Sequence, residues 1–165
     1  MTGICFGTKI CIEQKEVKCM CQVNTFMFKE DELDGEKLMK IIGIFQKAGF
    51  TNFYEYNNPN LRNIRRDLRL FQCGNFCDCG SVVTKKVVVN EMLETAESQK
   101  LTEIITKTLD VVSTAYLFSH WYKGNNDIAR EKVILERAPK KVSLDKLNEQ
   151  TYRDMFYNEV LEITK

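Results

Sequence analysis

The sequence has few of the residues and motifs that identify an enzyme. Its 165 residues include a single histidine, His120, which excludes HExxH proteases and metal centres that need two histidine ligands. No G-x-S-x-G turn offers a serine nucleophile to that histidine. The chain also lacks a C-x-x-C pair, a P-loop and a G-x-G-x-x-G phosphate cradle. No local motif therefore names a reaction.

Neither charge nor hydrophobicity is concentrated in any part of the chain. The formal net charge is +1, so no overall field favours nucleic acid or an anionic membrane as a partner. No apolar run approaches the roughly 20 residues that span a bilayer. The first residues, MTGICFGTKICIEQ, lack the basic and apolar regions of a signal peptide. We therefore expect a cytoplasmic protein that does not bind membranes.

The first part of the chain has clear local patterns. Apolar residues alternate over residues 17–28, which predicts a strand, and the residues before it are expected to form a hairpin that closes near residues 14–16. A helix is then predicted, with Asp34 as its N-cap and Gly49 just after its end. Its apolar face consists of Leu38, Ile41, Ile42 and Phe45, at i, i+3, i+4 and i+7.

The rest of the chain alternates between predicted strands and helices. The predicted strands are residues 51–57, 82–90 and 132–139, and the predicted helices are residues 60–71, about 91–124, and segments that begin at Ser143 and Thr151. These elements predict one globular domain over residues 1–165, of the α+β or small α/β class. Its N-terminal strands are expected to belong to a mixed or antiparallel sheet packed by about three or four helices.

Cysteine is the residue type that most needs an explanation. All seven cysteines lie in the first half of the chain, and an odd number without an export signal indicates reduced thiols or metal ligands. A tetrahedral zinc site needs four ligands. Cys73, Cys77 and Cys79 lie within seven residues, and in the metal hypothesis Cys19 or Cys21 completes the site. The interpretation that the sequence favours over it is that these cysteines are small buried residues without a ligand.

A catalytic interpretation of the same loop is also open. A thiolate or a metal-bound water near Cys73–Cys79 would act with Asp78 or His120 as the proton-transfer group. The negative charge of Asp78 opposes a lowered thiol pKa, which weakens this interpretation.

Arginines form the second candidate site. On the predicted helix, Arg62, Arg66 and Arg69 fall at i, i+4 and i+7, with Arg65 beside them. Together with Tyr54 and Tyr56 they resemble the basic and aromatic surfaces that bind single-stranded nucleic acid or a nucleotide phosphate. The alternative is a solvated helix face whose arginines pair with local carboxylates, and the near-neutral net charge favours it.

Together these features predict a cytosolic, non-enzymatic interaction or regulatory module with an unidentified protein partner. A cysteine-bound structural zinc is the one cofactor that the sequence suggests. A small enzyme centred on the cysteine loop is the first alternative, and nucleic-acid or nucleotide binding through the arginines is the second.

Overall fold

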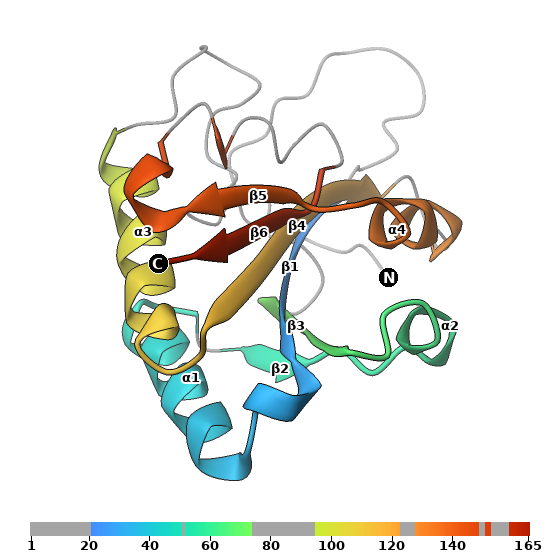
Figure 1. Ribbon diagram of the computed structural model, residues 1–165, viewed down its shortest axis with the longest axis horizontal. Helices are drawn as coiled ribbons and strands as arrows, with labels where there is room; N and C mark the ends of the chain where they lie inside the picture. Colours follow the sequence, from blue (N-terminus) through green and yellow to red (C-terminus); the bar gives the residue numbers. More distant parts are fainter. Residues whose placement is uncertain (1–20, 51, 74–94, 123–127, 149–150, 153–158) are drawn as a thin grey trace, which may run out of the picture.

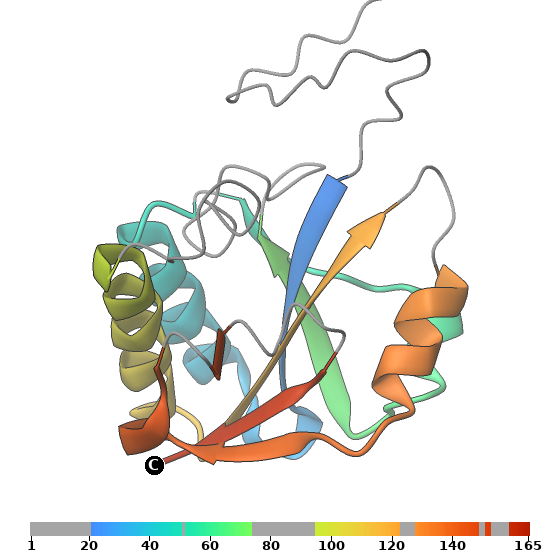
Figure 2. The ribbon, with the colours of Figure 1, turned by 90° about the horizontal axis from the view of Figure 1, so that it is seen from above.

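The computed structural model describes residues 21–50, 52–73, 95–122, 128–148, 151–152 and 159–165, and these form one mixed sheet with helices on both faces (Figures 1 and 2). The strands lie in the order β2-β3-β1-β4-β6-β5. Their bounds are β1 Cys21–Lys29, β2 Phe53–Glu55, β3 Leu68–Cys73, β4 Thr114–Tyr122, β5 Lys140–Ser143 and β6 Leu161–Thr164. The helices are α1 Gly35–Lys47, α2 Pro59–Arg62, α3 Thr95–Leu109 and α4 Ile128–Leu135, with short 3-10 turns η1 Glu30–Glu32 and η2 Leu144–Lys146.

The first four strands have a recognisable connectivity. β3 pairs antiparallel with both β2 and β1, and β1 pairs antiparallel with β4. With α1 between β1 and β2, and α3 between β3 and β4, this is the split β-α-β, or ferredoxin-like, arrangement. β6 extends the sheet antiparallel to β4, and β5 lies parallel to β6 at the edge. The predicted α+β class with a mixed sheet is confirmed.

The sheet separates two hydrophobic cores. α1 and α3 cover one face, and α2 and α4 lie on the other (Figure 2). Phe26 and Phe28 of β1 belong to the core under α1 and α3, whereas Met27 between them belongs to the opposite core. Successive residues of a strand point to opposite faces of the sheet. β1 therefore has apolar residues on both faces and is buried on both sides.

Local signals place α1 as the sequence predicts. Asp34 is the N-cap, and its carboxylate accepts a hydrogen bond from the backbone N–H of Lys37 at 2.8 Å. The helix ends before Gly49, whose φ of 94° is a left-handed conformation that glycine adopts without strain. Ile41 and Phe45 point into the core. Within the described residues, the predicted strands at 17–28 and 51–57 overlap β1 and β2.

The predicted helix over residues 60–71 is wrong. α2 ends at Arg62, Asn63 donates its side-chain amide to the carbonyl of Pro59, and β3 begins at Leu68. β3 is buried on both faces, with Leu70 in one core and Phe71 in the other. A strand with apolar residues on both faces lacks the alternation of apolar and polar residues by which strands are identified. The spacing of its apolar residues is then also compatible with a helix.

The predicted helix from about residue 91 to 124 is also wrong in its second half. α3 ends at Leu109, where the N–H groups of Val111 and Val112 both bond to the carbonyl of Thr108. The following segment, TAYLFSHWY, forms β4 between β1 and β6. The aromatic residues of this segment are common in strands, and pairing with β1 and β6 on its two sides stabilises the strand.

The predictions near the C-terminus fail in a similar way. Residues 132–139, predicted as a strand, contain the end of α4, which buries Ile134 and Leu135 against the sheet. Ser143 ends β5 and precedes only the short turn η2, not a helix. Thr151 and Tyr152 are helical, but most of that predicted helix lies outside the described residues. The predicted hairpin before residue 17 and the strand at residues 82–90 also lie outside them.

No helix within the described residues is long and apolar enough to cross a membrane.

Phe45 provides a direct test of the core under α1. Its ring is 1% exposed, stacks on Phe53 at 4.0 Å and meets Phe26 edge-on at 4.7 Å. We predict that Phe45→Ala lowers the free energy of unfolding by about 3–5 kcal/mol, because it leaves a cavity among these rings. Urea denaturation followed by circular dichroism measures the change.

The matched control lies on the same helix. Met39 is 66% exposed, so Met39→Ala is expected to change stability by less than about 0.5 kcal/mol. Equal effects of the two substitutions would contradict the described position of α1.

Candidate functional site

The predicted cysteine site is only partly within the described residues. Cys73 is the last residue of β3, is 3% exposed, and lies opposite Phe53 of β2. Cys21 is the first residue of β1, and its backbone lies opposite Tyr122 of β4. Cys19, Cys77 and Cys79 lie outside the described residues, as does Asp78. The zinc site and the catalytic cysteine loop therefore remain predictions.

Other acidic and histidine residues do not supply a metal site within the described part of the chain. No group of three or more histidine, cysteine, aspartate or glutamate side chains gathers there with the geometry of metal ligands. His120 lies in β4, with its backbone opposite Val23 of β1.

The predicted arginine helix does not form, and the arginines are spread over three elements. Arg62 is the last residue of α2, Arg65 and Arg66 lie in the turn after it, and Arg69 is in β3. Arg66 is exposed, and its nearest described partner is the side-chain oxygen of Asn63 at 3.5 Å. A row of arginines at i, i+4 and i+7 is therefore absent from this segment.

Two of these arginines are held by carboxylates. Arg65 donates two hydrogen bonds to Asp67, at 3.1 and 3.0 Å, and Arg69 donates two to Glu55, at 3.1 and 2.6 Å. The hydrogen bond with Asp67 is the largest of the effects that raise the pKa of Arg65, and Glu55 acts in the same way on Arg69. A phosphate would have to displace these carboxylates to bind the two guanidinium groups.

The two tyrosines of the predicted site also have partners in the fold. The hydroxyl of Tyr54, a residue that is 42% exposed, donates to the side-chain oxygen of Gln72 at 3.2 Å. The hydroxyl of Tyr56 accepts a hydrogen bond from the side-chain amide of Asn58 at 3.0 Å. Their contacts are structural, and ligand binding by this segment stays an untested prediction.

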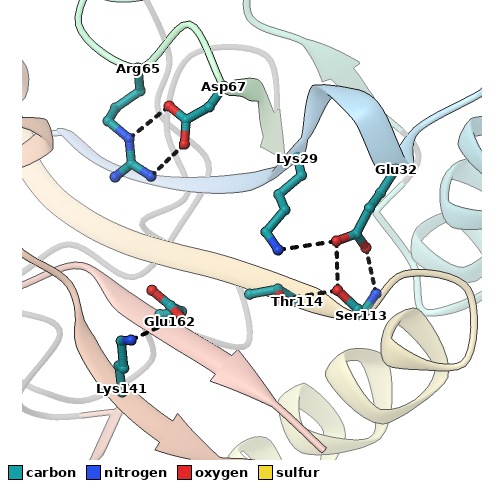
Figure 3. A network of polar contacts seen from close by, with 8 residues as sticks. All are labelled: Lys29, Glu32, Arg65, Asp67, Ser113, Thr114, Lys141 and Glu162. Carbon is teal, nitrogen blue, oxygen red and sulfur yellow. Dashed lines mark hydrogen bonds and ion pairs between the residues drawn. The ribbon is translucent and has the colours of Figure 1, made fainter.

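A network of polar contacts with balanced charges lies around the end of β1, the turn before β4, and β6 (Figure 3). Glu32 accepts hydrogen bonds from the backbone N–H and the hydroxyl of Ser113, at 2.6 and 2.5 Å, and pairs with Lys29 at 3.3 Å. These contacts join the end of β1 to the turn that precedes β4. Desolvation alone would raise the pKa of Glu32, but the Ser113 hydrogen bonds and Lys29 outweigh it, so the pKa is lowered.

The same network surrounds Tyr116 in the middle of the sheet. The guanidinium of Arg65 lies 5.5 Å from the centre of the Tyr116 ring, and Glu162 lies opposite Tyr116 on β6. Burial and then the charge of Glu162 raise the pKa of Tyr116. Glu162 also lies 4.0 Å from Lys141 of β5. The three cations and three carboxylates drawn in Figure 3 neutralise one another, which is typical of a structural network.

A groove between α1 and α3 has a different character. The two helices lie side by side on one face of the sheet (Figures 1 and 2), and the groove between them has a volume of about 400 Å³. One wall comes from the end of α1 and the other from the middle of α3. The lining residues are Ile44, Lys47, Ala48, Lys100, Glu103, Ile104 and Lys107.

The groove combines an apolar floor with a basic rim. Ile104 is 3% exposed and belongs to the core, and Ile44 and Ala48 pack against that core from α1. The side chains of Lys47, Lys100, Glu103 and Lys107 are exposed around them.

The rim has an excess of positive charge. Lys107 pairs with Glu103, while Lys47 and Lys100 make no ion pair with any described residue. The hydrogen bond from Lys107, its charge and then that of Lys100 lower the pKa of Glu103. Three lysines against one glutamate thus leave a local positive charge on a chain that is almost neutral overall.

Sequence reasoning did not find this groove. Lys100, Ile104 and Lys107 fall at i, i+4 and i+7, so the sequence indicates that they share one helix face, but this spacing does not distinguish a groove from an ordinary helix surface. Lys47 lies more than fifty positions earlier in the chain, and only the topology brings it beside α3.

Comparison of the chain with protein-family models, curated proteins and solved structures found no match.

Glu32 gives a pH-dependent test of the polar network. Its pKa is lower in the folded state than the ordinary value of 4.5, so it stabilises the fold above pH 4.5 and this stabilisation is lost as the pH falls through the folded-state pKa. We predict that Glu32→Gln costs about 1 kcal/mol at pH 7, because partly exposed charged hydrogen bonds are lost, and costs less at pH 3, where more of the carboxylate is protonated. Urea denaturation at both pH values measures the difference.

The control for this measurement is an exposed glutamate. Glu36 pairs with Lys40 on the surface of α1, with 78% of its side chain exposed, so Glu36→Gln is expected to have little effect at either pH. A cost for Glu32→Gln that does not depend on pH would show that the ionised carboxylate is not what stabilises the turn.

The zinc hypothesis has its own test. It predicts about one zinc per chain in protein purified without added metal, with three or four thiols protected from alkylation until the protein is denatured. Elemental analysis and thiol counting in the native and denatured states measure both quantities. Protein that contains no metal while all seven thiols react in the native state would contradict the hypothesis.

Proposed function

We propose that this chain is a non-enzymatic interaction module that binds an acidic segment of a partner protein in the groove between α1 and α3. The observation that carries the proposal is the composition of the groove, in which Lys47, Lys100 and Lys107 surround an apolar floor. The protein is further proposed to act in the cytoplasm, as an interaction or regulatory component.

The two parts of the groove would have different roles in binding. Burial of apolar side chains on Ile44, Ala48 and Ile104 supplies a favourable free energy of roughly 25 cal/mol per Å² of apolar surface removed from water. The lysines favour carboxylates over other groups, speed association and fix the register of the partner. A partner segment with apolar residues between acidic residues can contact both the apolar floor and the lysines.

The openness of the groove favours a protein segment over a small molecule. Pockets for small molecules usually enclose most of the ligand surface. Here 57% of the Lys107 side chain and 63% of the Glu103 side chain are exposed to solvent. A partner that extends beyond the groove covers such a rim, whereas a small anion would stay largely hydrated.

Two other functions remain proposals with less support. An enzyme at the cysteine loop depends on residues outside the described ranges, with Cys73 the exception. Nucleic-acid or nucleotide binding through Arg62, Arg65, Arg66 and Arg69 now lacks the single helix on which it was based. The lysine groove is favoured over both because its lysines and its apolar floor meet at one place.

The proposal predicts which peptides the protein selects. Random peptides displayed on phage would be selected in parallel on the wild-type protein and on the triple variant Lys47→Gln, Lys100→Gln, Lys107→Gln. We expect peptides enriched on the wild type to contain acidic and apolar residues, because the groove offers cations around an apolar floor. Their enrichment is expected to fall by at least about tenfold on the variant, and sequencing of the selected pools measures it.

The control variant has the same change in net charge on other surfaces. Lys132, Lys141 and Lys146 are exposed and lie outside the groove, so their triple replacement by glutamine is expected to leave selection unchanged. Circular dichroism confirms that both variants fold. Peptide pools that are equally enriched on the wild type and on the groove variant would overturn the proposal.

A further inference from the structure

We infer that the acidic segment binds as an α-helix aligned with α1 and α3, with two carboxylates seven residues apart and apolar residues between them. This inference rests on the proposed function, since it concerns the conformation of the partner in the same groove. It goes beyond that function because it specifies a spacing that can be recognised in a partner sequence.

The spacing of the lysines on α3 carries the argument. Lys100 and Lys107 are seven residues apart on one helix and both line the groove, so they are separated by about 10.5 Å along the helix axis. A partner helix matches this distance with acidic residues at i and i+7, which also lie on one face.

An extended partner does not match the same distance. Side chains on one face of a strand repeat every two residues, at about 6.6 and 13.2 Å. Neither spacing equals the separation of the two lysines, and a residue three positions along a strand points to the opposite face. A helix therefore matches the axial separation of the two lysines, whereas the nearest same-face spacing of a strand differs from it by about 2.7 Å.

The position of the groove between two neighbouring helices is compatible with a helical partner. A third helix packs against two others at interaxial distances of about 8–10 Å. The apolar floor formed by Ile44, Ala48 and Ile104 lies between the lysines. Apolar residues at i+3 and i+4 of the partner helix would meet this floor, since they share a face with i and i+7.

The two longest segments outside the described residues, 1–20 and 74–94, do not contain acidic residues at i and i+7. Residues 1–20 contain Glu13 and Glu16 as their only acidic residues, and residues 74–94 contain Asp78, Glu91 and Glu94. No two acidic residues within either segment are seven positions apart. The helix that fits the groove is therefore assigned to another protein.

Three synthetic peptides test the inference. The first has glutamates at i and i+7 and leucines at i+3 and i+4, in a background of alanine and glutamine. The second has the same composition, with glutamate and leucine placed for a period of two. The third is the first peptide with a proline at its centre, which breaks a helix. Each carries a fluorescent label, and anisotropy measures its affinity for the full chain at low salt.

We expect the first peptide to bind at least about tenfold more tightly than the other two, because only it presents both carboxylates and the leucines on one helical face. This preference is expected to disappear with the triple glutamine variant of Lys47, Lys100 and Lys107 and to persist with the control variant of Lys132, Lys141 and Lys146.

The remaining outcomes separate the two proposals. Equal or tighter binding of the period-two peptide, still dependent on the groove lysines, would overturn the helical conformation while the interaction function stands. The same holds if the proline has no effect on the first peptide. If no peptide binds in a way that depends on the groove lysines, both the inference and the function proposed for the groove are wrong.

Discussion

The structure depends on the burial of β1 on both of its faces. β1 lies between β3 and β4, so its backbone groups are paired on both sides, and its phenylalanines and methionine point into opposite cores. A strand in that position leaves apolar surface on two sides of the sheet, and each side has to be covered by helices. The two helical layers, and therefore every surface between helices, follow from this requirement.

The same topology creates the groove. Split β-α-β connections place α1 and α3 on the same face, where they pack side by side although the end of α1 and the start of α3 are separated by more than forty residues. The sides of the two helices that face the sheet pack in the core, as Phe45 and Ile105 do. At the boundary between the two helices, apolar side chains that pack in or against the core adjoin lysines that are exposed to solvent. Ile44 and Lys47 occupy that boundary on α1, as Ile104 and Lys107 do on α3.

Sequence reasoning succeeded where a signal is local and failed where pairing is distant. Asp34, the apolar face of α1 and Gly49 lie within one helix and its ends, so their pattern was sufficient. β3 and β4 were mistaken for helices because strands buried on both faces have no polar alternation, and their pairing with β1 is not visible in one sequence. The candidate site has the same limitation, since Lys47 and Lys100 meet only after the sheet has formed.

Binding of an anion has different energetic consequences at the paired arginines and at the lysine groove. At Arg65 and Arg69 an incoming anion would replace carboxylates that already make two hydrogen bonds each, so the gain is offset by the loss of Asp67 and Glu55. At the groove, an anion has to compete with Glu103 for Lys107, whereas Lys47 and Lys100 make no ion pair with a described residue. The lysines also adjoin apolar surface whose burial adds to the charge interaction. Net affinity depends on the difference between new and lost contacts, and that difference favours the groove.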